Sequence, residues 1–175
     1  VIEIFEAIVH RVEKHGHAVK HLRKAVRTTE RLLRSRLDAE GEAADVNRLI
    51  REVVADTCVA STLDDEQKAE LEAEFKLFLA ELGDFRFSIT KPYYTQREKK
   101  SPGSGGLLSI TVDPYACKGC NECVRVCDDD ALRTVVQTPE GTERLKLEWD
   151  VWQSLPTTSP EFIRIEDLDE RIGAL

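Results

Sequence analysis

The residues best suited to chemistry in this chain are four cysteines in one short stretch, Cys117, Cys120, Cys123 and Cys127. Their spacing is C-x2-C-x2-C-x3-C, and thiolates at these intervals are typical ligands of iron–sulfur clusters. Sulfur donors suit such a cluster because its iron prefers soft ligands. Gly119 allows the sharp backbone that a loop around a cluster needs. We therefore predict that the four cysteines bind a [4Fe-4S] cluster.

A structural zinc site is the main alternative for this cysteine run. Such sites usually combine two well-separated C-x2-C pairs or add histidines, and the run shows neither feature. Disulfides are not expected, because the cysteines are crowded and nothing in the sequence resembles a secreted protein. The iron–sulfur interpretation is favoured, and zinc stays open as the alternative.

The fifth cysteine, Cys58, follows the apolar stripe of a predicted helix. A lone cysteine in that position is most often a small buried hydrophobic residue. Cys58 is also an alternative fourth ligand, in place of Cys127. We favour Cys127 because it is local to the other three ligands.

Composition and charge restrict the classes of function. The chain has 175 residues, a net charge of −8 and a pI of about 5.1, which argues against general nucleic-acid binding. No stretch approaches the roughly 18 apolar residues of a membrane span. A reducing cytoplasm suits the predicted thiolates, so we expect a cytoplasmic protein. Because Val1 begins within a helical pattern, we also expect the chain to be a piece of a longer polypeptide.

Residues 1–83 carry helical periodicity and no catalytic motif. Apolar residues at alternating spacings of three and four predict a first helix over residues 1–37, in which Gly16 weakens the helix without ending it. Further helices are predicted over residues 43–59 and from about residue 63 to Gly83. We expect a helical bundle or a long helical arm that serves as scaffold or interaction surface, through which the chain could form homo-oligomers.

All four histidines lie in the first of these segments, namely His10, His15, His17 and His21. His17 and His21 are four residues apart, so on a helix they would share a face and could chelate a metal ion. No carboxylate or cysteine completes a known metal signature with them. We therefore interpret the histidines as solvated or seam residues.

The second half is predicted to contain strands, which makes the fold class α+β. Residues 84–106 read as a strand and a Gly/Ser-rich linker, residues 107–148 as a small iron–sulfur module, and residues 149–175 as a tail that leads to a further domain. Trp149 and Trp152 in the tail are interpreted as a packing anchor. The predicted strands cover residues 85–89, 107–112, 131–136 and 144–148, with a turn at residues 139–142 and a helix beginning near residue 162.

With these features laid out, residues 109–137 resemble the ferredoxin-type domain of pyruvate:ferredoxin (flavodoxin) oxidoreductases and related 2-oxoacid:ferredoxin oxidoreductases. Residues 149–175 resemble the tail that leads to the thiamine-diphosphate-binding domain of single-chain members. The resemblance implies an electron-transfer segment with one [4Fe-4S] cluster, whose ligands match Cys117, Cys120, Cys123 and Cys127. It also implies other domains or subunits of the parent enzyme as partners, ferredoxin or flavodoxin as electron acceptor, and thiamine diphosphate in the rest of the parent.

The sequence departs from this family in two ways. The family normally has proline after the last cysteine, whereas Asp128, Asp129 and Asp130 follow Cys127 here. Three carboxylates near a cluster would favour its oxidised form and lower its reduction potential. Only one cysteine run is present, although two-cluster ferredoxins contain two. A ferredoxin-like domain of another multi-domain redox complex therefore stays open as the runner-up, and no residue matches a thiamine- or coenzyme-A-binding motif, so no catalytic residue is assigned.

Overall fold

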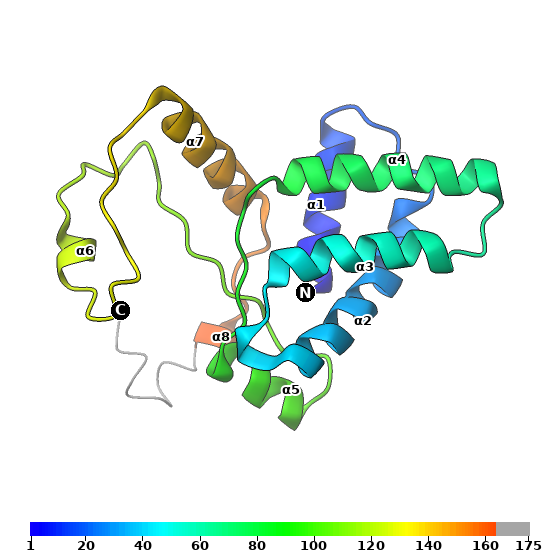
Figure 1. Cartoon of the computed structure of the whole chain (residues 1–175), viewed down its shortest axis with the longest axis horizontal. Helices are drawn as coiled ribbons and strands as arrows, with labels where there is room; N and C mark the ends of the chain where they lie inside the picture. The colour runs from blue at the N-terminus through cyan, green and yellow to red at the C-terminus, as the bar shows by residue number, and fades with distance from the viewer. Residues whose placement is uncertain (164–175) are drawn as a thin grey trace. The chain divides into compact units, whose positions relative to one another are not determined.

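The computed structural model describes residues 1–163, and its regular structure in that range is almost entirely helical. The chain divides into two compact units, one made of Val1–Ile110 and the segment from Ser154 onward, the other of Thr111–Gln153. The α-helices are α1 (Ile2–Lys14), α2 (Leu22–Glu40), α3 (Val46–Ala60), α4 (Asp65–Leu82), α5 (Gln96–Lys100), α6 (Glu122–Arg125), α7 (Pro139–Ser154) and α8 (Pro160–Ile163) (Figure 1). A short 3-10 helix, η1 (Gly41–Ala43), and a short π-helix, η2 (Lys91–Thr95), complete the helical structure.

The first four helices pack together, which confirms the predicted helical bundle. α1 contacts α2 and α4, and α3 contacts α2 and α4. The apolar stripes meet in a core where the ring of Phe78 lies edge-on to Phe5 at 5.4 Å and to Phe75 at 6.2 Å. All three rings are fully buried. The core therefore forms because each helix buries one apolar face, and aromatic pairs add to the burial.

The prediction of one continuous helix over residues 1–37 is wrong. α1 ends at Lys14, Gly16 adopts a φ of +86°, and α2 begins at Leu22. A left-handed φ suits glycine and is incompatible with continuing a right-handed helix. Gly16 thus turns the predicted arm into two helices of a bundle.

A buried carboxylate of α4 caps the start of α2. Glu74 is 6% exposed, and its two carboxylate oxygens accept backbone hydrogen bonds from Lys20, His21 and Leu22 at 2.7, 3.0 and 2.7 Å. The residue in the N-cap position, His21, makes no capping bond of its own. Since the first amides of a helix lack acceptors within it, Glu74 supplies them from a neighbouring helix.

The predicted second and third helices are confirmed, with caps that explain their bounds. The Asp45 carboxylate accepts a bond from the Arg48 amide at 3.0 Å before α3, and the Asp64 carboxylate accepts one from the Gln67 amide at 2.9 Å before α4. Gly83, with a φ of +56°, ends α4. Aspartate at an N-cap and glycine after the last turn are the residues that these positions favour.

The strands predicted over residues 85–89 and 107–112 are wrong, because these segments pair only through one isolated antiparallel bridge between Ser88 and Leu108. Asn47 of α3 takes the place of a strand partner. Its side-chain amide donates to the Phe85 carbonyl at 2.6 Å and accepts from the Phe87 amide at 3.0 Å. A buried side chain thereby satisfies backbone groups that a ladder would otherwise pair.

The Gly/Ser-rich stretch is held by hydrogen bonds to α5 and α2. The Glu98 carboxylate accepts bonds from the amides of Gly103 and Gly105, both at 2.7 Å. The same carboxylate pairs with the Arg34 guanidinium at 3.0 Å, and the Gly105 carbonyl accepts from that guanidinium at 3.2 Å. The two amides that could hold an external anion are therefore bound by a carboxylate of the chain itself.

The short helix α8 packs beside this stretch. The Arg97 guanidinium lies 4.4 Å from the centre of the Phe162 ring, and Arg97 also pairs with Glu161 at 2.5 Å. A Cβ at Gly106 would lie 2.7 Å from the Phe162 ring. Close packing of a ring on the backbone therefore requires glycine at position 106.

Gly106→Ala is expected to displace Phe162 and to lower the free energy of unfolding by about 1 kcal/mol, because the added methyl group overlaps the ring. The helix α8 should then become accessible to protease, as limited proteolysis followed by mass spectrometry would show. Ser101→Ala, at an exposed position of the same stretch, is the control and should leave the cleavage unchanged. Equal cleavage of the wild type and of Gly106→Ala would contradict the packing described here.

The second unit also lacks the predicted strands over residues 131–136 and 144–148. Residues 139–154 form the helix α7, so the turn predicted at residues 139–142 is the first turn of this helix. Pro139 is suited to a first helical position, and the Thr138 hydroxyl accepts a bond from the Gly141 amide at 3.0 Å. Trp149 and Trp152 stack on α7 with their ring centres 4.7 Å apart.

The predicted fold class is thus confirmed in its helical part and wrong in its sheet for residues 1–163, where a single bridge is the sole β-pairing. The helix predicted to begin near residue 162 corresponds to α8, and any continuation beyond residue 163 lies outside the described residues. Of the helices described, none is both long and apolar enough to cross a membrane.

Candidate metal centre

The cysteine loop starts with a turn built around Asp113. The Asp113 carboxylate accepts bonds from the amides of Tyr115 and Ala116 at 2.8 and 3.2 Å, and the Asp113 carbonyl accepts from the Cys117 amide at 3.0 Å. Aspartate favours such turns because its short side chain reaches the following amides. The turn fixes the direction in which the chain enters the cysteine run.

Two left-handed residues bend the chain between the first three cysteines. Gly119 has a φ of +63° and Asn121 a φ of +62°. Glycine and asparagine tolerate this conformation better than other residues. The role predicted for Gly119 is therefore confirmed, whereas the second bend at Asn121 was missed although asparagine is a recognisable signal for it. These bends turn the chain twice within the cysteine run.

The helix α6 (Glu122–Arg125) carries Cys123 and brings the chain to Cys127. The Cys127 amide donates to the Val124 carbonyl at 3.3 Å, and the Ala131 amide donates to the Cys127 sulfur at 3.3 Å. Hydrogen bonds to ligand sulfurs stabilise negative charge on them and tune an iron–sulfur centre. Sequence analysis missed this contact, because any residue other than proline carries such an amide.

The four cysteines fit a [4Fe-4S] cluster by ligand type and number. All four are free thiols, with Cys117, Cys120 and Cys123 exposed and Cys127 half-buried. Within residues 1–163, no three histidine, cysteine or acidic side chains are gathered as they would be around a metal ion. The run therefore presents the right donors on a bent loop without bringing them together at one point. In small metal modules, the arrangement of ligands forms together with metal binding.

The unit that carries the loop has almost no core of its own. Among its described residues only Val151 is buried. A set of large apolar side chains is exposed instead, namely Val112, Tyr115, Val126, Leu132, Val135, Val136, Leu147 and Trp152. A domain this small usually needs a metal, disulfides or a partner to be stable. Few apolar contacts therefore stabilise the described part of this unit.

Cys58 lies in the core of the other unit. The residue is 7% exposed, near the end of α3, and burial together with the nearby Glu72 carboxylate raises the pKa of its thiol. A thiol in this setting is held in its neutral form and behaves as a hydrophobic residue. The structure favours the interpretation of Cys58 as a core residue.

The three carboxylates after the run are exposed. Asp130 has a φ of +51°, and its amide donates to the Cys127 carbonyl at 3.3 Å. Within the described residues, none of Asp128, Asp129 and Asp130 forms an ion pair. Their negative charge is therefore not neutralised by nearby described residues.

Two of the four histidines, His15 and His21, pair with acids of α4, and His10 lies 3.9 Å from Glu13 of its own helix. His15 Nδ1 lies 2.5 Å from the Glu81 carboxylate, and His21 Nε2 lies 3.0 Å from the Glu70 carboxylate. Histidines 17 and 21 do not share a helix face, because only His21 adjoins α2. Since His15 and His17 are exposed, the solvated interpretation fits them, while His21 is a half-buried contact to α4.

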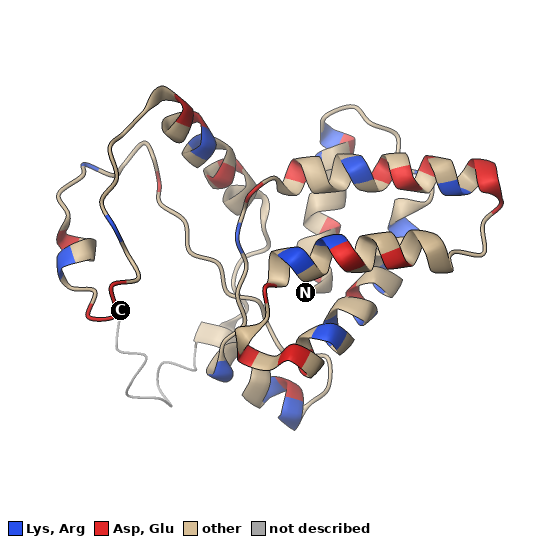
Figure 2. Cartoon of the chain, in the orientation of Figure 1, with Lys and Arg blue, Asp and Glu red and all other residues tan. Residues whose placement is uncertain are grey.

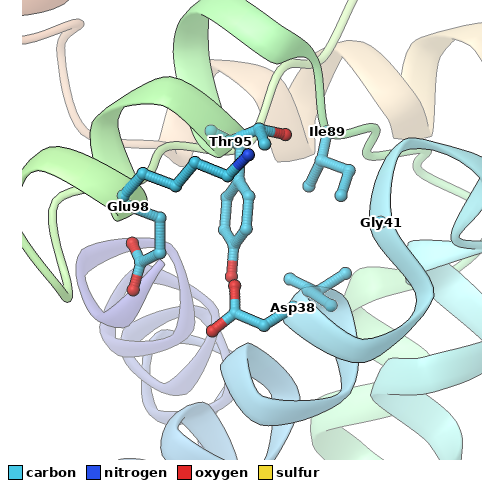
Figure 3. Close-up of a pocket in the computed structure, with 8 residues that line it drawn as sticks. Asp38, Gly41, Ile89, Thr95 and Glu98 are labelled. Atoms are coloured by element: carbon cyan, nitrogen blue, oxygen red, sulfur yellow. The ribbon is translucent and has the colours of Figure 1, made fainter.

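A surface pocket of about 220 Å³ lies in the first unit, lined by Leu37, Asp38, Gly41, Ile89, Tyr94, Thr95, Glu98 and Lys99 (Figure 3). Burial, followed by the nearby carboxylates of Asp38 and Glu98, raises the pKa of the Tyr94 hydroxyl far above its usual range. The phenol therefore stays protonated at neutral pH, and Glu98 is engaged by Arg34 and two glycine amides.

Comparison with known proteins identifies no relative, since no family model, curated protein or solved structure matches the chain.

Proposed function

We propose that Cys117, Cys120, Cys123 and Cys127 bind a [4Fe-4S] cluster and that the chain transfers single electrons through it. The observation that carries the proposal is the C-x2-C-x2-C-x3-C run of free thiols on a loop with two left-handed bends. Other uses of four such closely spaced thiols fit less well, because they form no disulfide and lack a second, distant C-x2-C pair. The zinc alternative predicts a protein without redox activity.

The chain's own residues have three roles in this proposal. The four thiolates hold the cluster, which supplies one-electron redox chemistry when bound. The Ala131 amide, 3.3 Å from the Cys127 sulfur, donates a hydrogen bond that stabilises charge on that ligand. The carboxylates of Asp128, Asp129 and Asp130 would have the opposite effect on the reduction potential and lower it, because they disfavour the additional negative charge of the reduced state.

The resemblance of residues 109–137 to the ferredoxin-type domain of 2-oxoacid:ferredoxin oxidoreductases supports a more specific proposal. The chain would be the electron-transfer segment of such an enzyme, with the thiamine diphosphate chemistry elsewhere in the parent. Its partners would be other domains or subunits of the parent, with ferredoxin or flavodoxin as electron acceptor. The buried Cys58 leaves Cys127 as the fourth ligand in this proposal.

Replacing Asp128, Asp129 and Asp130 together with asparagine is expected to raise the reduction potential of the cluster, because three uncompensated negative charges are removed. Solvent screening limits the effect, so it should be larger at low ionic strength than at high. A redox titration followed by electron paramagnetic resonance measures it.

The control for this prediction removes the same charge from α4, with Asp65→Asn, Glu66→Gln and Glu72→Gln. These substitutions change the net charge equally but lie in the other unit. Equal potentials for the aspartate variant and the wild type at low salt would contradict an electrostatic role for the three aspartates.

The test of the proposed function is reduction of the anaerobically purified protein by dithionite, followed by electron paramagnetic resonance at low temperature. We expect a reduced-cluster signal that accounts for about one electron per chain. A metal-bound protein that takes up no electron would favour the zinc alternative and would refute electron transfer.

A further inference from the structure

The outer face of α2 carries three cations, Lys24, Arg27 and Arg31, and all three side chains are exposed. Their spacing of three and four residues places them on one side of the helix, along about 10 Å of its length. Figure 2 shows the basic stretches of this helix. We call these three residues the α2 basic face.

The α2 basic face differs from the other cations of the same helix because it is not neutralised. Arg23 pairs with Glu13 at 2.5 Å, Arg34 with Glu30 and Glu98, and Arg36 with Glu52 and Asp56. Lys24, Arg27 and Arg31 form no ion pair with any residue that the structure describes. The helix thus has a neutralised side and a basic side, on a chain whose net charge is −8.

The arrangement is unfavourable for the helix itself. Like charges three and four residues apart repel each other on a helix surface. Lys24 also lies in the first turn of α2, where cations oppose the helix dipole. No residue of that turn is acidic, and the Glu74 carboxylate of α4 caps the amides at its start. Residues that weaken local structure without a compensating contact are expected at functional surfaces.

We propose that the α2 basic face is the docking site for an acidic electron-carrier protein, an inference that rests on the proposed electron-transfer function. Complementary charge is what such a surface offers, because it steers a partner of opposite sign and fixes its orientation. A nucleic acid is less suited to it. α2 contains no aromatic residue on which bases could stack.

The test is titration of the purified chain with an acidic flavodoxin in an isothermal calorimeter. We expect binding that weakens several-fold when the ionic strength rises from about 0.05 to 0.3 M, because exposed charges are screened. The variant Lys24→Glu/Arg27→Glu/Arg31→Glu should bind at least about tenfold more weakly. All three positions are exposed, and substitutions at such positions change stability little, so this variant should fold, as circular dichroism would verify.

A matched control reverses three exposed cations outside α2, with Lys76→Glu, Arg86→Glu and Lys100→Glu. This control should bind flavodoxin within about twofold of the wild type if position, and not net charge, determines docking. The proposal would be overturned if the wild type and the α2 variant bound flavodoxin with equal affinity. It would also be overturned if the control variant lost as much affinity as the α2 variant. The absence of flavodoxin binding together with salt-sensitive binding of a single-stranded RNA oligonucleotide would overturn it as well.

The iron content and the reduced-cluster signal separate this inference from the proposed function. The α2 variant should retain both, because Cys117, Cys120, Cys123 and Cys127 are unchanged. If the α2 variant retains its cluster and binds flavodoxin as tightly as the wild type does, the docking site is refuted and the proposed electron-transfer function is not. A wild-type chain that contains no cluster refutes the proposed function, whatever it binds.

Discussion

Cys120→Ser is expected to reduce the bound iron from about four atoms per chain to less than one, and to abolish the absorbance of the cluster near 400 nm. The physical reason is that serine replaces a soft thiolate with a harder oxygen ligand. Position 120 lies between the two left-handed residues of the loop, so a neighbouring thiol cannot easily take its place. Iron analysis and visible absorbance of anaerobically prepared protein measure the effect.

Cys58→Ser and Cys127→Ser provide the matched controls for this prediction. Cys58 is buried in the helical unit, so its replacement should leave iron and absorbance unchanged and lower stability slightly. Cys127→Ser should lose the cluster. The reverse pattern, with loss in Cys58→Ser and retention in Cys127→Ser, would show that Cys58 is the fourth ligand and would contradict the ligand set proposed here.

Glu74→Ala is expected to lower the free energy of unfolding of the helical unit by about 3 kcal/mol, through the loss of charged hydrogen bonds. The Glu74 carboxylate accepts bonds from three backbone amides at the start of α2, at 2.7 to 3.0 Å. Alanine would leave these amides without this acceptor, and the amide of Leu22 is buried. Urea denaturation followed by circular dichroism at 222 nm measures the change.

Two variants of α4 show whether the capping role explains the effect. Glu72→Ala removes an exposed glutamate from the same helix and should change stability by no more than about 0.5 kcal/mol. Glu74→Gln keeps an acceptor oxygen and should lie between the wild type and Glu74→Ala. If Glu74→Ala and Glu72→Ala were equally stable, the cap would contribute little and the account of the α1–α2 junction would be incorrect.

The spacing of apolar residues predicted most of the helical unit correctly, because the buried face of each helix determines where its apolar residues occur. The apolar series predicted as one seam continues through both α1 and α2, where Phe5, Val12, Leu22 and Leu33 are buried. The break between the two helices could not be found from periodicity alone. It depends on the left-handed Gly16 and on Glu74, which lies more than 50 residues away in the sequence.

The strands were predicted incorrectly because the alternation of apolar and polar residues shows only that a segment is able to pair with a neighbouring strand. In residues 85–89, Asn47 supplies the hydrogen bonds that a neighbouring strand would have supplied. In residues 144–148, apolar and charged residues also fit a helix, and the ion pairs Glu143–Lys146 and Arg144–Glu148 join positions three and four apart. The cap at Thr138 then favours the helix.

The candidate site was predicted from the sequence alone because the type and spacing of its cysteines are local properties. Its bends at Gly119 and Asn121 are local too, since each depends on the conformational freedom of one residue. The contact from the Ala131 amide to the Cys127 sulfur is not local in this sense, because it depends on how residues 128–130 turn. Spacing therefore predicts which residues are ligands, and the tuning contacts require the structure.

Iron, acid-labile sulfide and zinc, measured on the anaerobically purified chain, test the central claim most directly. We expect about four irons and four sulfides per chain, with negligible zinc, because the chain offers four free thiolates at the spacing of a [4Fe-4S] cluster. About one zinc per chain, or no metal after anaerobic reconstitution with iron and sulfide, would contradict the assignment of this loop as an electron-transfer centre.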